Sequence, residues 1–81
     1  MNQQDTDYIY FLDNMENFYH KYGHKFVVVK NKTILNVYDD YLTAYDETLK
    51  TEKLGTFLIQ ECFENEEKMT RRFHRDILVA V

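Results

Sequence analysis

The sequence predicts a small α+β domain with an N-terminal helix, a β-hairpin, a second helix and one or two further strands in a single, mainly antiparallel sheet packed by helices. Three observations predict this class. Apolar residues recur at spacings of three and four over residues 6–22, two β-branched runs flank a polar turn within residues 25–38, and an apolar run follows Gly55. The 81 residues suffice for one domain, which we expect to span residues 1–81.

The first element is expected to be a helix over residues 6–22, with residues 1–5 disordered. Asp5 or Thr6 would begin it by accepting hydrogen bonds from the free N–H groups of the first turn. Gly23 would end it, because glycine readily takes the left-handed conformation that closes many helices. The residues at helical spacing are Tyr8, Phe11, Leu12, Met15, Phe18, Tyr19 and Tyr22.

A hairpin is predicted over residues 25–38. Its first strand, residues 26–29, is apolar at every position, which indicates a strand covered on both faces. The turn is centred on Asn31 and Lys32, since asparagine tolerates positive φ. Lysine is an unusual second residue for such a turn, so a one-residue slip is the alternative. The second strand comprises residues 34–38.

A second helix is predicted over residues 40–53, followed by a strand over residues 56–62. Asp39 and Asp40 stand where a helix cap is needed, and Gly55 would end the helix. Capping explains these aspartates better than a catalytic pair does. The expected apolar stripe of this helix is Tyr41, Leu42, Tyr45 and Leu49.

The C-terminal segment allows two interpretations. Residues 69–80 are predicted as a further strand, because Phe73, Ile77, Val79 and Val81 share one parity. The alternative is a short helix that begins at Asn65 and runs to residue 75.

The central segment resembles a family of short, uncharacterised bacterial and archaeal domains. Their pattern is a helix, a "vvikdgkvlgvydd"-like hairpin, a helix and a "gtfliq"-like strand, which here corresponds to VVVKNK, YDD and GTFLIQ. The match covers roughly residues 11–62 and departs at Lys32, where the family more often has glycine. The resemblance implies this fold and assigns no activity, cofactor or catalytic residue.

Composition narrows the setting and the partners. Cys62 is the only cysteine and the N-terminus is polar and acidic, so we expect a cytoplasmic protein, with no membrane association. A net charge of −4 argues against general nucleic-acid binding, which depends on neutralising phosphates. Seven tyrosines exceed what so small a core easily buries, and some are expected to form a dimer face or binding patch.

Few residues suggest chemistry, and each has a simpler explanation. His20 and His24 have the spacing of metal ligands on a helix, but Gly23 lies between them and no third ligand is near. Cys62 with His74 would need a third, orienting group to act as a nucleophile and base. We therefore expect no catalytic residue, no metal and no cofactor, and hence not an enzyme.

The best candidates for a partner surface lie in the basic segment after the acidic run 61–67. Arginine beside an aromatic residue is enriched at interfaces, but also protects edge strands from aggregation. The candidate interface residues are Arg71, Arg72, Phe73 and Arg75.

Two functions follow as hypotheses. The first is a protein-interaction module that acts through a protein partner or through self-association, as a homodimer. The second is an acidic inhibitor or decoy that blocks a basic nucleic-acid-binding channel, with a phage as one source of such a protein. Its basis is the acidic character of residues 1–18 and 61–67.

Overall fold

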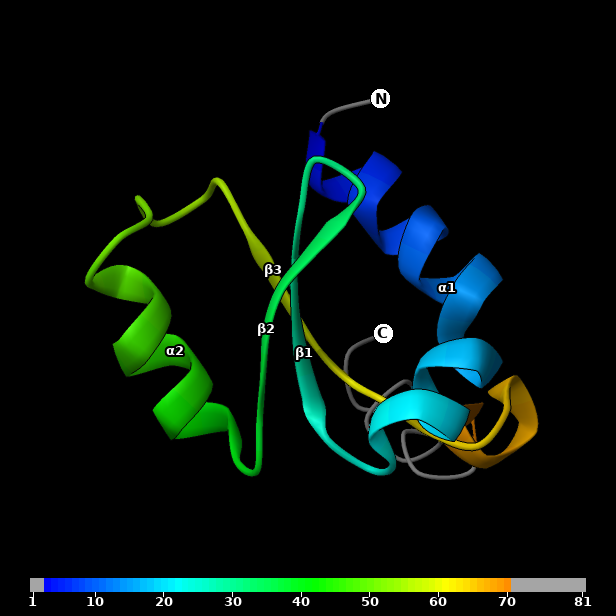
Figure 1. Ribbon diagram of the computed structural model, residues 1–81. Helices are drawn as coiled ribbons and strands as arrows, with labels where there is room; N and C mark the ends of the chain where they lie inside the picture. The colour runs from blue at the N-terminus through cyan, green and yellow to red at the C-terminus, as the bar shows by residue number, and fades with distance from the viewer. Residues whose placement is uncertain (1–2, 71–81) are drawn as a thin grey trace.

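A computed structural model describes residues 3–70, in which two helices cover opposite faces of a three-stranded sheet (Figure 1). The α+β class and the antiparallel sheet are confirmed. The elements are α1 (Gln3–Tyr22), β1 (Phe26–Lys30), β2 (Thr33–Tyr38), α2 (Tyr41–Leu49) and β3 (Leu58–Glu61).

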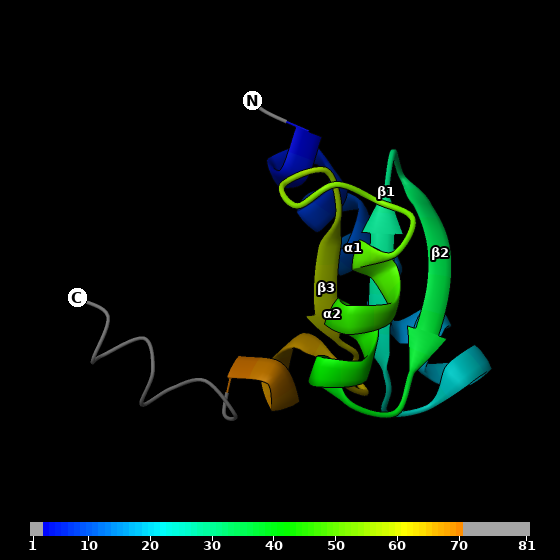
Figure 2. The ribbon, with the colours of Figure 1, turned by 90° about the vertical axis from the view of Figure 1, so that its left-hand side faces the viewer.

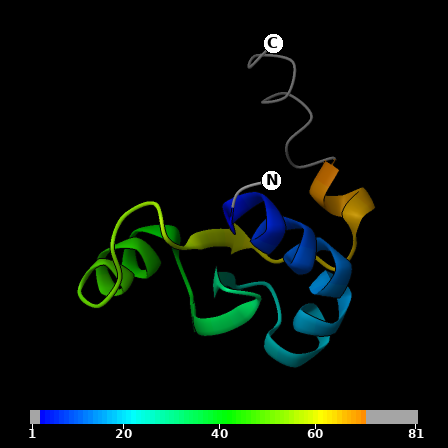
Figure 3. The same ribbon diagram turned by 90° about the horizontal axis from the view of Figure 1, so that it is seen from above.

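β1 is the middle strand of the sheet, whose order is β2-β1-β3. Both helices contact β1, one from each face, and the view along the sheet in Figure 3 shows the sheet between them. Val27 and Val29 belong to the cluster under α1, whereas Val28 belongs to the cluster under α2. All three valines are fully buried, as expected for a strand that is apolar at every position.

The hairpin turn lies where the sequence places it. Asn31 and Lys32 have φ values of +53° and +55°, the two positive angles of a type I′ turn. In such a turn the two central N–H groups point away from the hairpin, and here both donate to one carboxylate. Asp7 of α1 accepts from the N–H of Asn31 at 3.2 Å and from that of Lys32 at 2.9 Å. A buried aspartate, 1% exposed, therefore fastens the hairpin to α1.

The pairing of β1 with β2 contains a bulge. Val28 lies opposite Asn36 but Val29 lies opposite Ile34, so Leu35 is the extra residue of β2. Leu35 is exposed, and the ribbon of β2 is curved in Figure 2, as is usual for a strand that contains a bulge.

The ends of α1 differ from expectation at one terminus only. The helix already includes Gln3, Gln4 and Asp5, so the prediction that Asp5 or Thr6 caps it, with disorder up to residue 5, is wrong for residues 3–5. Residues 1–2 lie outside the described residues. At the other end Gly23, with a φ of +83°, donates its N–H to the Tyr19 carbonyl at 2.8 Å and ends the helix as predicted.

α2 begins as predicted but ends early. The Asp40 carboxylate accepts from the Thr43 N–H at 3.0 Å and from the Thr43 hydroxyl at 2.6 Å, which is an N-cap. The helix ends at Leu49 because the next N–H groups bond to carbonyls three positions back. The predicted end at Gly55 is wrong: Gly55 is the third residue of a turn in which the Thr56 N–H bonds to the Lys53 carbonyl at 3.1 Å.

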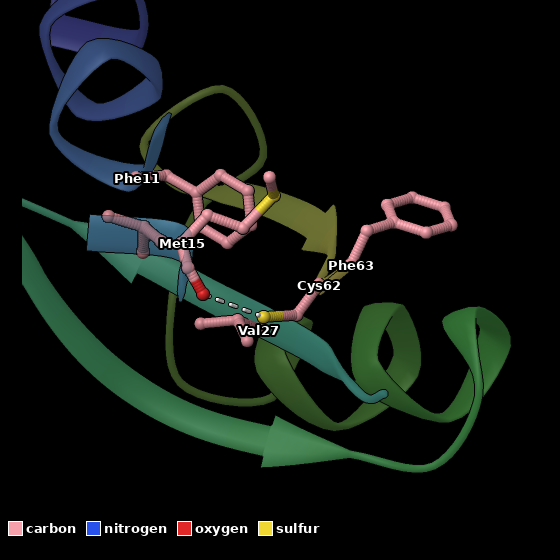
Figure 4. Close-up of a cluster of buried hydrophobic side chains, with 6 residues drawn as sticks. Phe11, Met15, Val27, Cys62 and Phe63 are labelled. Atoms are coloured by element: carbon pink, nitrogen blue, oxygen red, sulfur yellow. Dashed lines mark hydrogen bonds between the residues drawn. The ribbon is translucent and has the colours of Figure 1, made fainter. Parts of the chain in front are cut away.

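The larger cluster lies between α1 and the sheet and contains the single cysteine. Cys62 is fully buried, and its Sγ lies 3.6 Å from the Met15 carbonyl, to which the thiol donates (Figure 4). Burial raises the pKa of the Cys62 thiol to about 11. The buried members of this cluster are Phe11, Met15, Val27, Val29, Cys62 and Phe63.

Residues 66–70 form a short helical turn rather than the start of a strand. Asn65 caps it, because its side-chain oxygen accepts from the Lys68 N–H at 2.9 Å and its carbonyl from the Met69 N–H at 3.2 Å. The strand predicted over residues 69–80 is therefore wrong at residues 69 and 70, where the helical alternative holds. The rest of that prediction lies outside the described residues.

Candidate protein-binding surface

The face of the sheet under α2 is thinly covered. Its cluster has only three buried residues, Val28, Ala44 and Phe57. The prediction that Tyr41, Leu42, Tyr45 and Leu49 face the core is wrong for three of the four, since only Tyr45 is partly buried and Leu42 is 70% exposed. The buried positions of α2 are instead Ala44 and Thr48, small side chains that let the helix lie close to the sheet.

Two tyrosines of α2 stack on its exposed flank. The rings of Tyr41 and Tyr45 lie 6.2 Å apart and nearly parallel, at 15°. Phe26 of β1 meets Tyr41 edge to face, with centroids 6.2 Å apart and an angle of 77°. Aromatic side chains held in this way offer a large apolar contact area without loss of much side-chain freedom.

A groove of about 300 Å³ runs between this flank and β3. Leu54, which is 69% exposed, and Phe57, which is 6% exposed, both line this groove. The lining residues are Gln4, Tyr41, Tyr45, Leu54, Gly55, Phe57, Leu58 and Ile59. Tyrosine, leucine, isoleucine and phenylalanine therefore predominate, which is typical of a site that binds an apolar side chain.

β3 forms the border of this groove and is an edge of the sheet. The Cys62 N–H bonds to the Lys25 carbonyl at 2.8 Å, so Cys62 directs its backbone groups toward β1. Because backbone groups alternate along a strand, those of Glu61 and Ile59 point away from the sheet. The same alternation places the Phe57 carbonyl outward, where the side-chain amide of Gln4 donates to it at 3.1 Å.

The two edges of the sheet are therefore unlike. β2 carries the bulge at Leu35, and bulges disfavour pairing with a further strand. β3 pairs with β1 in continuous register from Leu58 to Glu61. Within residues 3–70, β3 is thus the edge with regularly spaced backbone donors and acceptors beside an apolar groove.

The acidic segments of the sequence meet on the other side of the molecule. Asp13 and Glu16 of α1 line one depression with Glu66 and Glu67, which come from the second acidic run. The depression has a volume of about 460 Å³ and is open to solvent. Nearby, Lys68 pairs with Glu64 at 2.8 Å and lowers the pKa of that carboxyl.

His20 and His24, which were considered as metal ligands, have different surroundings. His24 bonds through Nε2 to Glu61 at 2.7 Å, and its ring lies tilted beside that of Phe63 with centroids 5.3 Å apart, whereas His20 is exposed on α1. Among residues 3–70, no group of three or more histidine, cysteine, aspartate or glutamate side chains is placed to hold a metal ion.

The residues considered for catalysis have structural roles where they are described. Asp40 caps α2, and Asp39 pairs with Lys25. Cys62 is buried in the core, while its suggested partner His74 lies outside the described residues. The interface candidates Arg71, Arg72, Phe73 and Arg75 also lie outside them.

Sequence reasoning missed the groove and the contact that we call the clamp at Asp7, in which the Asp7 carboxylate accepts hydrogen bonds from the N–H groups of Asn31 and Lys32. Two of the seven tyrosines, Tyr41 and Tyr45, line the groove together with Gly55, so the tyrosine excess was the one signal in the sequence that pointed toward it. Nothing local to residue 7 indicates that its carboxylate reaches residues 31 and 32, since the contact is set by how α1 packs on the sheet.

No family model, curated protein or solved structure matches this chain. The resemblance to short bacterial and archaeal domains therefore stays a prediction. Within the described part of the chain, none of the helices combines the length and the apolar character needed to cross a bilayer.

Proposed function

We propose that this protein is an interaction module that binds an extended segment of a partner protein along β3. The observation that carries the proposal is the combination of an open, regular strand edge with an adjacent apolar groove. Strand addition obtains affinity from main-chain hydrogen bonds and specificity from pockets for alternate side chains.

The geometry indicates what such a segment would look like. Its backbone would pair with the outward groups of Ile59 and Glu61, and every second side chain would lie over the groove beside Tyr45 and Leu54. The protein has a net charge of −4, so a segment with positive charge would associate faster. We therefore propose an apolar-alternating, net basic segment; a second copy of the chain is the alternative occupant.

Selection from a library of displayed peptides, using the full chain as bait, tests this proposal. We expect enriched peptides to have large apolar residues at alternate positions, and to shift the NMR resonances of Ile59, Glu61 and Tyr45. Enrichment of amphipathic helical patterns, or shifts confined to other surfaces, would contradict it.

Two leucines provide a matched pair of variants. Leu54 and Leu42 are 69% and 70% exposed, but only Leu54 lines the groove. Leu54→Asp should weaken binding of a selected peptide by about tenfold or more, whereas Leu42→Asp should leave it within about twofold. Each leucine buries little surface, so both variants should fold.

A second candidate function is the acidic inhibitor or decoy. One observation favours it: both acidic segments line the same depression, with Asp13, Glu16, Glu66 and Glu67 on its walls. Carboxylates gathered on one face imitate a nucleic-acid backbone in charge. Competition with single-stranded DNA for a DNA-binding protein should then weaken steeply as salt rises. Equal inhibition by Asp13→Asn/Glu16→Gln, or none by the native chain, would rule it out.

A further inference from the structure

Glu61, at the end of β3, differs from the other carboxylates that form ion pairs within residues 3–70. Its partner is His24, whose Nε2 lies 2.7 Å from Oε2 of the carboxylate. A histidine side chain carries a charge only when it is protonated, so this pair gives Glu61 no permanent cation. The acidic residues that pair with a lysine instead are Asp39, Glu47, Glu52 and Glu64.

The Glu61 side chain is also the least exposed of these five. It is 15% exposed, whereas the other four range from 23% to 82%. An ionised carboxylate loses part of its hydration when it is covered, and a bound cation offsets that loss. The hydrogen bond with His24 uses Oε2, and a carboxylate accepts at both oxygens, so a further donor can be accommodated. Glu61 is therefore suited to receive an ammonium or guanidinium group.

Glu61 lies on the side of the sheet that carries the groove. Ile59 is opposite Val28 of β1, and both side chains belong to the cluster under α2. Glu61 is opposite Phe26, which packs against the same cluster. Because opposite residues of an antiparallel pair share a face, the Glu61 side chain follows that of Ile59 on the groove side.

The free edge of β3 is limited at its other end. Figure 2 shows β3 along the edge of the sheet away from β2. The outward carbonyl of Phe57 already accepts a hydrogen bond from Gln4 at 3.1 Å. A strand added to this edge would therefore pair with Ile59 and Glu61, the next residues whose backbone groups point outward. A ligand that uses this edge thus lies beside Glu61.

An antiparallel ligand has a defined register on these two residues. The ligand residue opposite Ile59 would place its side chain over the groove, and the residue opposite Glu61 would be two positions earlier in the ligand. Opposite residues have Cβ atoms about 4.5–5.5 Å apart, so a lysine or arginine at the earlier position can reach the Glu61 carboxylate. Antiparallel is the orientation of both strand pairs in the sheet.

We infer that Glu61 selects a basic residue in the partner, so that the segment bound along β3 has lysine or arginine two positions before a large apolar residue. This inference deepens the proposed function and rests on it. The apolar residue lies in the groove, whereas the basic residue fixes the register. A shift by one residue would turn both side chains to the opposite face of the sheet.

Side-by-side selections from a library of displayed peptides test this preference. The baits are the full native chain, Glu61→Gln and Glu47→Gln; both variants lose the same charge, but Glu47 does not line the groove. The native chain and Glu47→Gln should enrich peptides with lysine or arginine two positions before a large apolar residue, and Glu61→Gln should not. The reverse order, with the basic residue two positions after the apolar one, would indicate parallel pairing and overturn the inference.

A change in the peptide tests the contact without altering the protein. Replacement of the basic residue of a selected peptide by methionine should weaken its binding to the native chain about fivefold. The same replacement should change binding to Glu61→Gln by less than about twofold, as fluorescence anisotropy of labelled peptides can measure. Equal weakening with both proteins would show that the basic residue acts elsewhere and would overturn the inference.

The outcomes separate this inference from the proposed function. Enriched peptides that alternate in apolar character but show no basic preference would remove the role of Glu61 and leave binding along β3 in place. Failure of the native chain to enrich any alternating peptide would contradict the proposed function as well.

Discussion

The two faces of the sheet are built differently. Under α1, six buried side chains form a continuous core, and a buried carboxylate fastens the helix to the hairpin. Under α2, only three apolar side chains are buried, and most of the large apolar residues of the helix face outward. The first face therefore holds most of the buried apolar side chains, and the second leaves large apolar side chains exposed. The predictions below compare the two faces.

The largest contrast should be in thiol reactivity. Cys62 lies in the closed core and its thiol pKa is raised to about 11, so at pH 8 it should react with an alkylating reagent only through unfolding. We expect a rate roughly a thousandfold below that of the denatured chain. A cysteine introduced on the other face by Leu42→Cys should react at once in the same molecule. Mass spectrometry distinguishes single from double labelling. Rapid labelling of both cysteines would contradict the expected difference between the two faces.

Truncation of the buried aromatic residue of α1 should cost the most stability. Phe11 is fully buried, so Phe11→Ala should lower the free energy of unfolding by about 3–5 kcal/mol. The control on the other face is Tyr41→Ala, where a half-exposed ring loses its stacking contacts at a cost of about 1 kcal/mol. Urea denaturation measures both, and equal losses would show that the faces contribute equally.

Loss of the clamp at Asp7, which joins α1 to the hairpin, should have the next largest effect on the free energy of unfolding. Asp7→Ala leaves the N–H groups of Asn31 and Lys32 without their carboxylate and should cost about 1–3 kcal/mol. Asp7→Asn keeps one acceptor oxygen and should cost less. Urea midpoints of the two variants provide the measurement. An Asp7→Ala variant as stable as the native chain would mean that water replaces the carboxylate.

Relief of the strained turn should stabilise the protein. Lys32 has a φ of +55°, a conformation that costs a residue with a side chain about 1 kcal/mol relative to glycine. Lys32→Gly keeps the N–H that donates to Asp7, so the thermal midpoint should rise. Thr33→Gly, at a neighbouring position in β2, is the control and should lower it.

The cap of α2 should have the smallest effect, and it depends on pH. Hydrogen bonds from the Thr43 hydroxyl and N–H lower the pKa of Asp40 below its usual 3.8. A lowered pKa means that the stabilisation is present above pH 3.8 and is lost as pH falls through the lower, folded-state value. Asp40→Ala should therefore destabilise the protein slightly at pH 7, and the difference from the native chain should shrink as the pH is lowered below 3.8, as chemical denaturation at a series of pH values can establish.

Local chemistry made part of this structure predictable. Asparagine at residue 31 selects the turn, glycine at residue 23 accepts a φ of +83°, and Asp40 is three residues before the N–H that it caps. In each case the partner lies within four residues, so the sequence contains the whole interaction.

Long-range packing set the rest. The rotation of α2 that buries Ala44 and Thr48 depends on how closely the helix approaches β1, and spacing alone favoured the larger residues. Asp7 is 24 residues from Asn31, and no pattern in either segment announces their contact. The same rotation of α2 brings Tyr41 and Tyr45 to the groove, so the sequence alone did not locate the candidate site.

The clamp at Asp7 also bears on the order of events during synthesis. Residue 7 leaves the ribosome before any part of the hairpin, so the carboxylate that receives the turn is available when residues 31 and 32 emerge. A nascent chain can thus seat its hairpin on the first helix while α2 and β3 are still being made.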